Sequence, residues 1–219
     1  MNEKIKQLRR DILQTSFDVG ACHIGSALSC LEILVDLFYN KLKEDDIFLF
    51  SKASGVAALY VILADKGYFP KEKLAEYLKN YPLASKEVPG IIHSVGSLGH
   101  GLPVAVGMAY ANRSRKVYVL VGDAELQEGT TYESVLFASQ HRLDNLYVIV
   151  DGNELQACGK ISDILDLTGS KVFLDVEFHN FRWVKTIKGK GISFMENDYT
   201  WHYKNLTSEL LEQALKENE

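Results

Sequence analysis

Two short apolar runs with a helical segment between them constrain the fold more than any other feature of this chain. Residues 116–122 and 145–151 are rich in β-branched and aromatic side chains, and residues 129–141 have a helical pattern. Strands that are apolar at nearly every position are typical of a parallel sheet covered on both faces. We therefore predict an α/β fold, a parallel sheet with helices on both faces, in one domain that spans residues 1–219.

The composition is that of an ordinary folded protein. Of the 219 residues, 47% are hydrophobic and 24% are charged, which is typical of globular domains and excludes disordered and fibrous classes. The formal net charge is -5 and the chain has no block of Lys and Arg residues. We therefore expect no nucleic-acid partner, because a phosphate backbone would be repelled.

The sequence also predicts where the protein works. No apolar run approaches the roughly 20 residues that a membrane helix needs, and residues 1–10 are charged without an apolar leader. These features predict a cytoplasmic protein with no membrane partner. Cys22, Cys30 and Cys158 show no CxxC spacing, so neither a disulfide framework nor a zinc site is expected, and each is predicted to be buried or partly buried.

Apolar spacing places the remaining elements. A stripe at 4–17 predicts a helix that ends at Gly20, and 55–64 is apolar all round, as in a helix buried between layers. Ser29 begins a capping-box pattern, so a second helix is predicted at 29–39 after a polar turn. The other expected elements are helices at 71–78 and 104–111, a strand at 183–187, a C-terminal helix capped by Thr207, an irregular loop at 82–101, and a polar tail from about 188 that includes a solvated Lys-Gly-Lys-Gly loop.

Two polar residues follow the two apolar strands. Asp123 comes directly after the first strand and Asn153 after the second, and neighbouring parallel strands bring such ends to one edge of the sheet. A carboxylate and an amide carbonyl are hard oxygen ligands suited to Mg²⁺, which takes few protein ligands and binds phosphate oxygens as well. The alternative is an aspartate that only caps the following helix.

The Gly-Asp to Asn signature occurs with further segments in a fixed order, and together they resemble the N-terminal, diphosphate-binding half of transketolases. The segments are 20–26 (Gly-Ala-Cys-His-Ile-Gly-Ser), 96–102 (Gly-Ser-Leu-Gly-His-Gly-Leu), 122–129 (Gly-Asp-Ala-Glu-Leu-Gln-Glu-Gly) and 186–191 (Thr-Ile-Lys-Gly-Lys-Gly) with 194–196 and 201–202. Each block alone is weak, whereas the ordered set is specific and covers most of the chain.

The resemblance implies a thiamine diphosphate site with Mg²⁺, in a trimmed version of that cofactor-binding fold. By motif position, Asp123, the Asn153 side chain and the Leu155 carbonyl match the metal ligands. His23 and His202 match catalytic histidines, His23 against the donor sugar and His202 near the diphosphate and the substrate. Further cofactor-binding positions are Gly96 and Leu98 on the cofactor rings, Gly122, Ala124 and Ile187, together with Glu128 as a buried carboxylate at the subunit interface and His100 near the cofactor.

The sequence departs from the family pattern at several points. Where the family has Ser-Lys-Gly-His, residues 51–54 read Ser-Lys-Ala-Ser, and the following Gly-His-Pro motif is missing. Ala124 replaces a usual glycine, which a negative φ would accommodate. The segment 161–182 is shorter than in the family. These changes put the choice of substrate in doubt, and they do not touch the predicted metal ligands.

The resemblance also implies a partner, because family members activate the cofactor with a glutamate from a pyrimidine-binding domain that this chain is too short to contain. We expect the N-terminal subunit of a split transketolase, assembled as a hetero-tetramer with a C-terminal subunit that carries this glutamate. The expected reaction moves a two-carbon ketol unit from a ketose or ketose phosphate to an aldose.

Other functions are open at this stage. Another thiamine diphosphate enzyme subunit, either a decarboxylating dehydrogenase component or a synthase with an acyl donor, would use the same cofactor. A degenerate scaffold subunit without cofactor would keep the fold alone. A dinucleotide-binding domain is set aside, because no GxGxxG follows a first strand.

Overall fold

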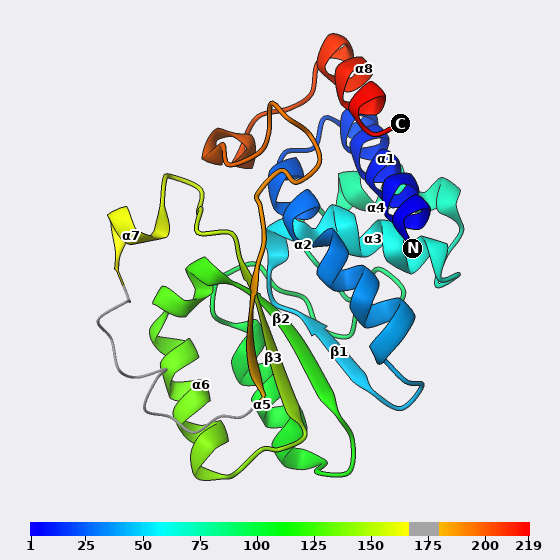
Figure 1. Ribbon diagram of the computed structural model, residues 1–219. Coiled ribbons are helices and arrows are strands. Elements are labelled where there is room, and N and C mark those ends of the chain that lie inside the picture. Colours follow the sequence, from blue (N-terminus) through cyan, green and yellow to red (C-terminus); the bar gives the residue numbers. More distant parts are fainter. Residues whose placement is uncertain (167–179) are drawn as a thin grey trace.

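The computed structural model describes residues 1–166 and 180–219, and a four-stranded parallel sheet lies at its centre (Figure 1). The strands are β1 (Ile47–Phe50), β2 (Val117–Gly122), β3 (Leu146–Gly152) and β4 (Phe181–Lys185), and they are ordered β1-β2-β3-β4. Gly122 pairs with Asp151, so the carboxyl ends of the two central strands are level. The α/β class predicted from the apolar strands is confirmed.

Helices cover the sheet on both sides. They are α1 (Asn2–Val19), α2 (Ile24–Asp36), α3 (Val56–Asp65), α4 (Leu74–Asn80), α5 (Gly101–Ala111), α6 (Gly129–Gln140), α7 (Ile161–Ile164) and α8 (Ser208–Glu217). Along β2, Tyr118 and Leu120 join the core of α1, α2 and α3, whereas Val117, Val119 and Val121 join a second core with α5 and α6. Because successive side chains of a strand point to opposite faces, an all-apolar strand fills two cores at once.

The first two helices show where the sequence pattern succeeded and where it was wrong. The predicted end at Gly20 is confirmed, since Gly20 adopts a left-handed conformation with φ 63°. The prediction that Ser29 caps the second helix is wrong, because α2 begins at Ile24 and Ser29 lies in its interior. The Ser29 hydroxyl donates to the buried Asp151 carboxylate instead, so the residue type that suits a cap serves a tertiary contact.

The predicted irregular loop is also present, between α4 and α5. The buried Tyr60 of α3 holds its start, because the phenol hydroxyl donates to the carbonyls of Tyr81 (3.0 Å) and Leu83 (3.2 Å). At its end, an added Cβ at Gly101 would lie 2.4 Å from the Ser51 hydroxyl, so the loop approaches the end of β1 as closely as glycine allows.

The C-terminal segment packs back onto the start of α2. The Gly189 N–H donates to the Gly25 carbonyl at 2.9 Å, and Lys188 is 1% exposed. The predicted solvated loop is therefore wrong at Lys188, although Thr207 caps α8 as predicted by accepting from the Leu210 N–H.

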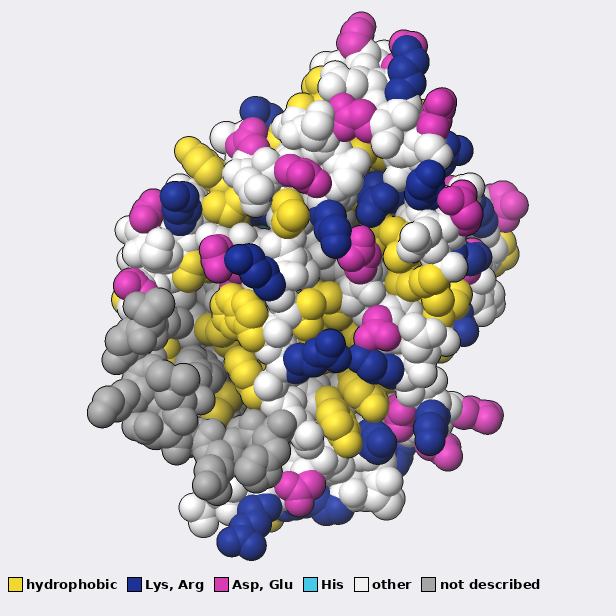
Figure 2. Space-filling view, in the orientation of Figure 1, with side chains coloured by type: hydrophobic (Ala, Val, Ile, Leu, Met, Phe, Trp, Pro, Cys, Tyr) yellow, Lys and Arg dark blue, Asp and Glu magenta, His cyan; other side chains and the backbone are white. Residues whose placement is uncertain are grey.

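Three further expectations can be placed. Cys30 is buried and Cys22 is partly buried, but Cys158 is exposed, against the prediction. The shortened segment predicted at 161–182 falls largely outside the described residues. No helix in residues 1–166 and 180–219 is long and apolar enough to cross a membrane. On the face seen in Figure 2, Lys and Arg side chains are interspersed with Asp and Glu.

Candidate active site

A cavity of about 290 Å³ lies at the carboxyl ends of β1 and β2. This is the edge at which ligands of open α/β sheets bind. Most of the residues that the sequence singled out line it, namely His23, Gly96, Leu98, Gly122, Asp123, Ala124, Leu155 and His202. The structure thus brings together residues that are up to 179 positions apart in the chain.

Asp123 is the carboxylate of this cavity, and it is 3% exposed. Its two oxygens accept from the backbone N–H groups of Ala124 (2.9 Å) and Glu154. Burial raises the pKa of Asp123 to about 6, although the Lys52 charge and these N–H groups act against it. In the described part of the chain Asp123 has no salt-bridge partner, so a cation bound in the cavity would stabilise its charge.

The turn after β3 presents oxygens beside Asp123. The Asn153 Oδ1 accepts from the Leu155 N–H at 3.0 Å, and its Nδ2 donates to the Ser29 hydroxyl at 2.9 Å. Glu154 between them has φ 64°, a conformation that is uncommon for a residue with a side chain and often marks a functional turn. Ala124, by contrast, is not one of the non-glycine residues with positive φ, so a methyl group is accommodated there as expected.

No cluster of three or more His, Cys, Asp or Glu side chains suited to a metal ion occurs in residues 1–166 and 180–219. A cation at this edge would be held by one carboxylate with amide and carbonyl oxygens. Such a donor set is chemically right for Mg²⁺ that also binds phosphates, and too poor in soft ligands for zinc.

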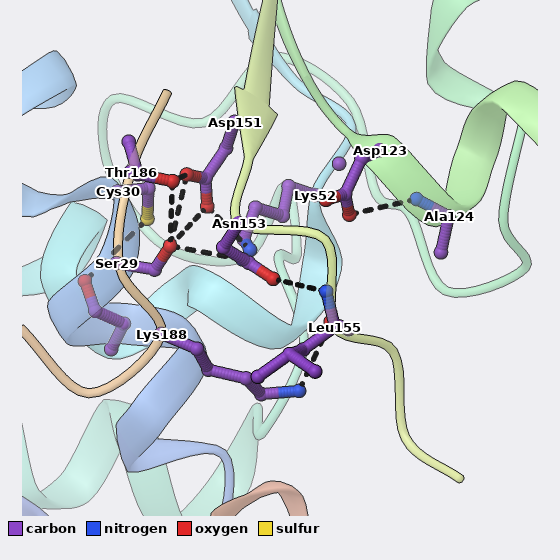
Figure 3. A network of polar contacts seen from close by, with 12 residues as sticks. Ser29, Cys30, Lys52, Asp123, Ala124, Asp151, Asn153, Leu155, Thr186 and Lys188 are labelled. Atoms are coloured by element: carbon purple, nitrogen blue, oxygen red, sulfur yellow. Dashed lines mark hydrogen bonds and ion pairs between the residues drawn. The ribbon is translucent and has the colours of Figure 1, made fainter. Parts of the chain in front are cut away.

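A buried ion pair lies next to the site at the end of β3 (Figure 3). The Lys52 Nζ lies 2.6 Å from Asp151 Oδ2, and Asp151 is fully buried. Ser29 and Thr186 also donate to this carboxylate. Although burial lowers the pKa of Lys52, the adjacent Asp151 and Asp123 carboxylates outweigh it and raise the pKa above its ordinary value, so Lys52 is charged.

Lys188 places a second cation in the cavity. Its Nζ donates to the carbonyls of Leu155 (3.3 Å) and Gln156 (3.1 Å) and lies 3.5 Å from the His202 Nδ1. Burial and the Lys52 charge lower the pKa of Lys188 to about 8.

The cavity lining holds two lysines, Lys52 and Lys188, and two carboxylates, Asp123 and Glu125, and Lys52 is also paired with Asp151. An anionic ligand would therefore be attracted by Lys188 and by a cation bound at Asp123, and not by a net positive charge of the lining.

His23 and His202 face each other across one wall. Their rings are in edge contact with centroids 4.6 Å apart. The backbone N–H of His23 donates to the backbone carbonyl of His202 at 3.0 Å. His23 directly precedes α2, in a left-handed conformation with φ 67°. Burial and the neighbouring Lys188 lower the pKa of both histidines, that of His202 to about 3. Both imidazoles are therefore neutral at pH 7 and can donate or accept one hydrogen bond.

Glu125 is a central residue that the sequence reasoning missed. Its buried carboxylate accepts from the Ser51 hydroxyl, from the Gly99 N–H at 3.0 Å and from the Gly122 N–H at 2.7 Å. It thereby joins the end of β1, the glycine-rich loop of residues 96–101 and the end of β2. The available signal was the three-residue spacing from Gly122, which is that of a capping box.

Four predicted residues lie outside the cavity lining. Glu128 is partly buried and packs beside Gly99, and Ile187 is partly buried in the segment after β4. His100 is exposed, and its Nδ1 lies 2.9 Å from the Leu98 carbonyl. Asn153 is buried directly behind the lining, where its side chain bonds Ser29.

Comparison with known proteins agrees with this geometry. Residues 2–186 match the family model described as transketolase, thiamine diphosphate binding domain. The chain is 36% identical to one of the subunits of the apulose-4-phosphate transketolase of Actinobacillus succinogenes, over 99% of this chain and 95% of that protein. It is 30% identical to the 6-deoxy-6-sulfo-D-fructose transketolase subunit SqwG of a Clostridium species, over 97% and 94%.

Longer transketolases match over part of their length. Human transketolase is 28% identical over 99% of this chain and 42% of its own sequence. The crystal structure of the transketolase from Campylobacter jejuni superposes with a TM-score of 0.85 at 24% identity, again over 99% of this chain and 42% of that one. The fold, the motifs and the family match therefore show that this chain belongs to the transketolase family and contains its thiamine diphosphate-binding domain.

Proposed function

We propose that this chain is the N-terminal subunit of a split transketolase, which acts only in complex with a second polypeptide. Two relatives that match over nearly their full length are named as transketolase subunits, which supports this assignment. The partner would carry the pyrimidine-binding domain and its activating glutamate, in a hetero-tetramer, and Glu128 beside the glycine-rich loop would face it.

The observation that carries the proposal is the content of one cavity. It joins two buried carboxylates, two lysines, two neutral histidines and a turn of glycine and leucine at the carboxyl end of the sheet. A diphosphate needs positive charge, sugar hydroxyls need neutral hydrogen-bonding groups, and aromatic cofactor rings need an apolar surface. This chain supplies the last two directly, and Lys188 together with a cation held at Asp123 would supply the first.

We infer that Mg²⁺ holds the diphosphate, with Asp123, the Asn153 side-chain oxygen and the Leu155 carbonyl as its protein ligands. Support comes from the donor set and from the buried Asp123 carboxylate, which has no salt bridge in the described ranges. The positive charge of Lys188 would add to the attraction for phosphate oxygens, whereas the charge of Lys52 is balanced by Asp151. Gly122, Ala124 and Ile187 would complete the surroundings of the cofactor.

Thiamine diphosphate, when bound, supplies the carbon nucleophile and electron sink that ketose cleavage requires. The chain's own residues would orient the reactants. Gly96 and Leu98 would pack against the cofactor rings. His23 and His202 would hydrogen-bond the sugar's oxygens, and their lowered pKa keeps each ring neutral near pH 7, with one nitrogen able to donate a hydrogen bond and the other able to accept one.

The reaction would transfer a two-carbon ketol unit from a ketose to an aldose. The substrates named for the two subunit relatives carry a phosphate and a sulfonate, so we include sugars with such an anionic end among the substrates. The family match favours this reaction over a decarboxylating or acyl-donor enzyme, and the retained carboxylate and histidines favour it over a scaffold without cofactor.

The test is an assay of ketose cleavage with this chain, its partner and both together, with and without thiamine diphosphate. We expect turnover only for the complex with cofactor, with ketoses and not with pyruvate. Cofactor-independent turnover, or activity with pyruvate alone, would contradict the proposal.

A further inference from the structure

Ser29 lies in the interior of α2, is 1% exposed, and has a hydroxyl that contacts three polar side chains. The hydroxyl donates to the Asp151 carboxylate, with 2.9 Å to Oδ1 and 2.8 Å to Oδ2, and it accepts from the Asn153 Nδ2 at 2.9 Å. It also lies 3.2 Å from the Thr186 hydroxyl. Ser29 lies outside the lining of the active-site cavity, so it can act on a bound group only through another residue.

The Asp151 carboxylate sets the direction of these hydrogen bonds. It is fully buried and pairs with the Lys52 Nζ at 2.6 Å, so it is ionised and can only accept. A serine hydroxyl has one proton, and in Ser29 this proton is directed at Asp151. The Ser29 oxygen then presents only lone pairs to its other neighbours, and a donor is required opposite it.

Asn153 has a donor end and an acceptor end, and its neighbours allow one orientation. With Nδ2 toward Ser29, Oδ1 accepts from the Leu155 N–H at 3.0 Å, so both ends are satisfied. A turned amide would place its oxygen against the Ser29 lone pairs and its NH₂ group against the Leu155 N–H. Figure 3 shows Asn153 between Ser29 and Leu155, with the oxygen end toward Leu155.

We propose that Ser29 is a positioning residue, which holds the Asn153 amide so that its oxygen, and not its NH₂ group, is presented to the Mg²⁺ site. The inference rests on the proposed function and adds to it a residue that touches neither the metal nor the cofactor. An amide NH₂ group is a donor and offers no free lone pair to a cation. Without Ser29, a turned amide would therefore remove one of the three protein ligands.

Thr186 offers a matched comparison. Its hydroxyl also donates to Asp151, and in the described part of the chain it makes no hydrogen bond with Asn153. Ser29→Ala and Thr186→Val each remove one hydroxyl donor from the same buried carboxylate. A purely structural role of Ser29 therefore predicts the same result for both variants, whereas a positioning role predicts a difference in metal affinity.

Mg²⁺ would be titrated calorimetrically into the complex of this chain with the proposed partner, at saturating thiamine diphosphate. We expect Ser29→Ala to raise the Kd for Mg²⁺ about tenfold, the effect of losing a group that orients a metal ligand, and Thr186→Val to raise it less than twofold. Both should lower the urea midpoint of unfolding by similar amounts. Ser16→Ala removes a buried hydroxyl of α1 that has no hydrogen-bond partner in residues 1–166 and 180–219, and it should leave the Kd unchanged.

Asn153→Asp tests the orientation itself, because either oxygen of a carboxylate can bind a cation. In the Asn153→Asp background, Ser29→Ala should change the Kd for Mg²⁺ less than twofold. A general loosening of the site would instead weaken binding in both backgrounds alike. If Asn153→Asp alone prevents Mg²⁺ binding, the comparison of Ser29→Ala with Thr186→Val decides.

The outcomes separate this inference from the proposed function. If the wild-type complex binds no thiamine diphosphate with Mg²⁺, the proposed function fails and the inference fails with it. If the wild type binds both, and Ser29→Ala has the same Kd for Mg²⁺ as Thr186→Val, the inference alone is overturned.

Discussion

Glu125 should be the carboxylate on which the geometry of the site depends most. It accepts three hydrogen bonds, from Ser51, Gly99 and Gly122, while it is 1% exposed. Each hydrogen bond to a charged group is worth about 1.5–3 kcal/mol, and leaving its donor buried without a partner costs a similar amount. Neighbouring bonds are not additive, and removing the carboxylate also removes its own desolvation cost. We therefore expect Glu125→Ala to lower the free energy of unfolding by about 3–4 kcal/mol.

Glu125→Gln separates charge from shape. Its amide oxygen can still accept at one side, whereas its NH₂ group faces a donor at the other, so a loss of about 2 kcal/mol is expected. Urea denaturation of the two variants beside Glu133→Ala, an exposed carboxylate of α6, measures the difference at unchanged m-value. Because Gly99 belongs to the loop of Gly96 and Leu98, both Glu125 variants should also bind cofactor more weakly. A loss below 1 kcal/mol for Glu125→Ala would refute the reasoning.

Two further predictions concern other titratable groups of the site. Burial and the charges of Lys188, His23 and Lys52 lower the pKa of His202 to about 3 in the folded chain. Between pH 6.5 and about 3, the unfolded chain therefore binds a proton at His202 that the folded chain does not bind. Acidification from pH 7 to 5 should destabilise the protein, with about 1 kcal/mol of the loss coming from His202 after allowance for its partial exposure. In urea titrations at both pH values, His202→Gln should remove that part of the loss, and an unchanged pH dependence would contradict it. Asp151→Asn leaves Lys52 buried without its counter-ion and should cost about 3–5 kcal/mol, and a cost below 1 kcal/mol in the same assay would show that the pair is not structurally important.

Much of the fold could be predicted from the sequence, because its signals are local. The strands at 117–122 and 146–152 are continuous apolar runs, and glycine at position 20 stops a helix by its own conformation. Asp123 and Asn153 could be placed at one edge because parallel strands end there. These inferences need no knowledge of distant contacts.

The errors arose where a residue serves a distant partner. Ser29 has the chemistry of a helix cap, but its hydroxyl is used by Asp151, which lies 122 positions away. Lys188 begins a Lys-Gly-Lys-Gly segment that is typical of a surface loop, yet its side chain is buried against the carbonyls of the turn that follows β3. The three-way role of Glu125 depends on Ser51 and Gly99, whose proximity only the folded chain reveals. Periodicity carries no information on such pairings.

The most direct test of the proposed cofactor site is a calorimetric titration of thiamine diphosphate into the complex of this chain with the proposed pyrimidine-domain partner. Wild type, Asp123→Ala and the control Asp45→Ala, an exposed carboxylate at the opposite end of the sheet, would each be titrated with Mg²⁺ and with EDTA. We expect binding to wild type and Asp45→Ala that requires Mg²⁺ and is lost in Asp123→Ala. Equal binding by Asp123→Ala, or no binding by a stable wild-type complex, would contradict it.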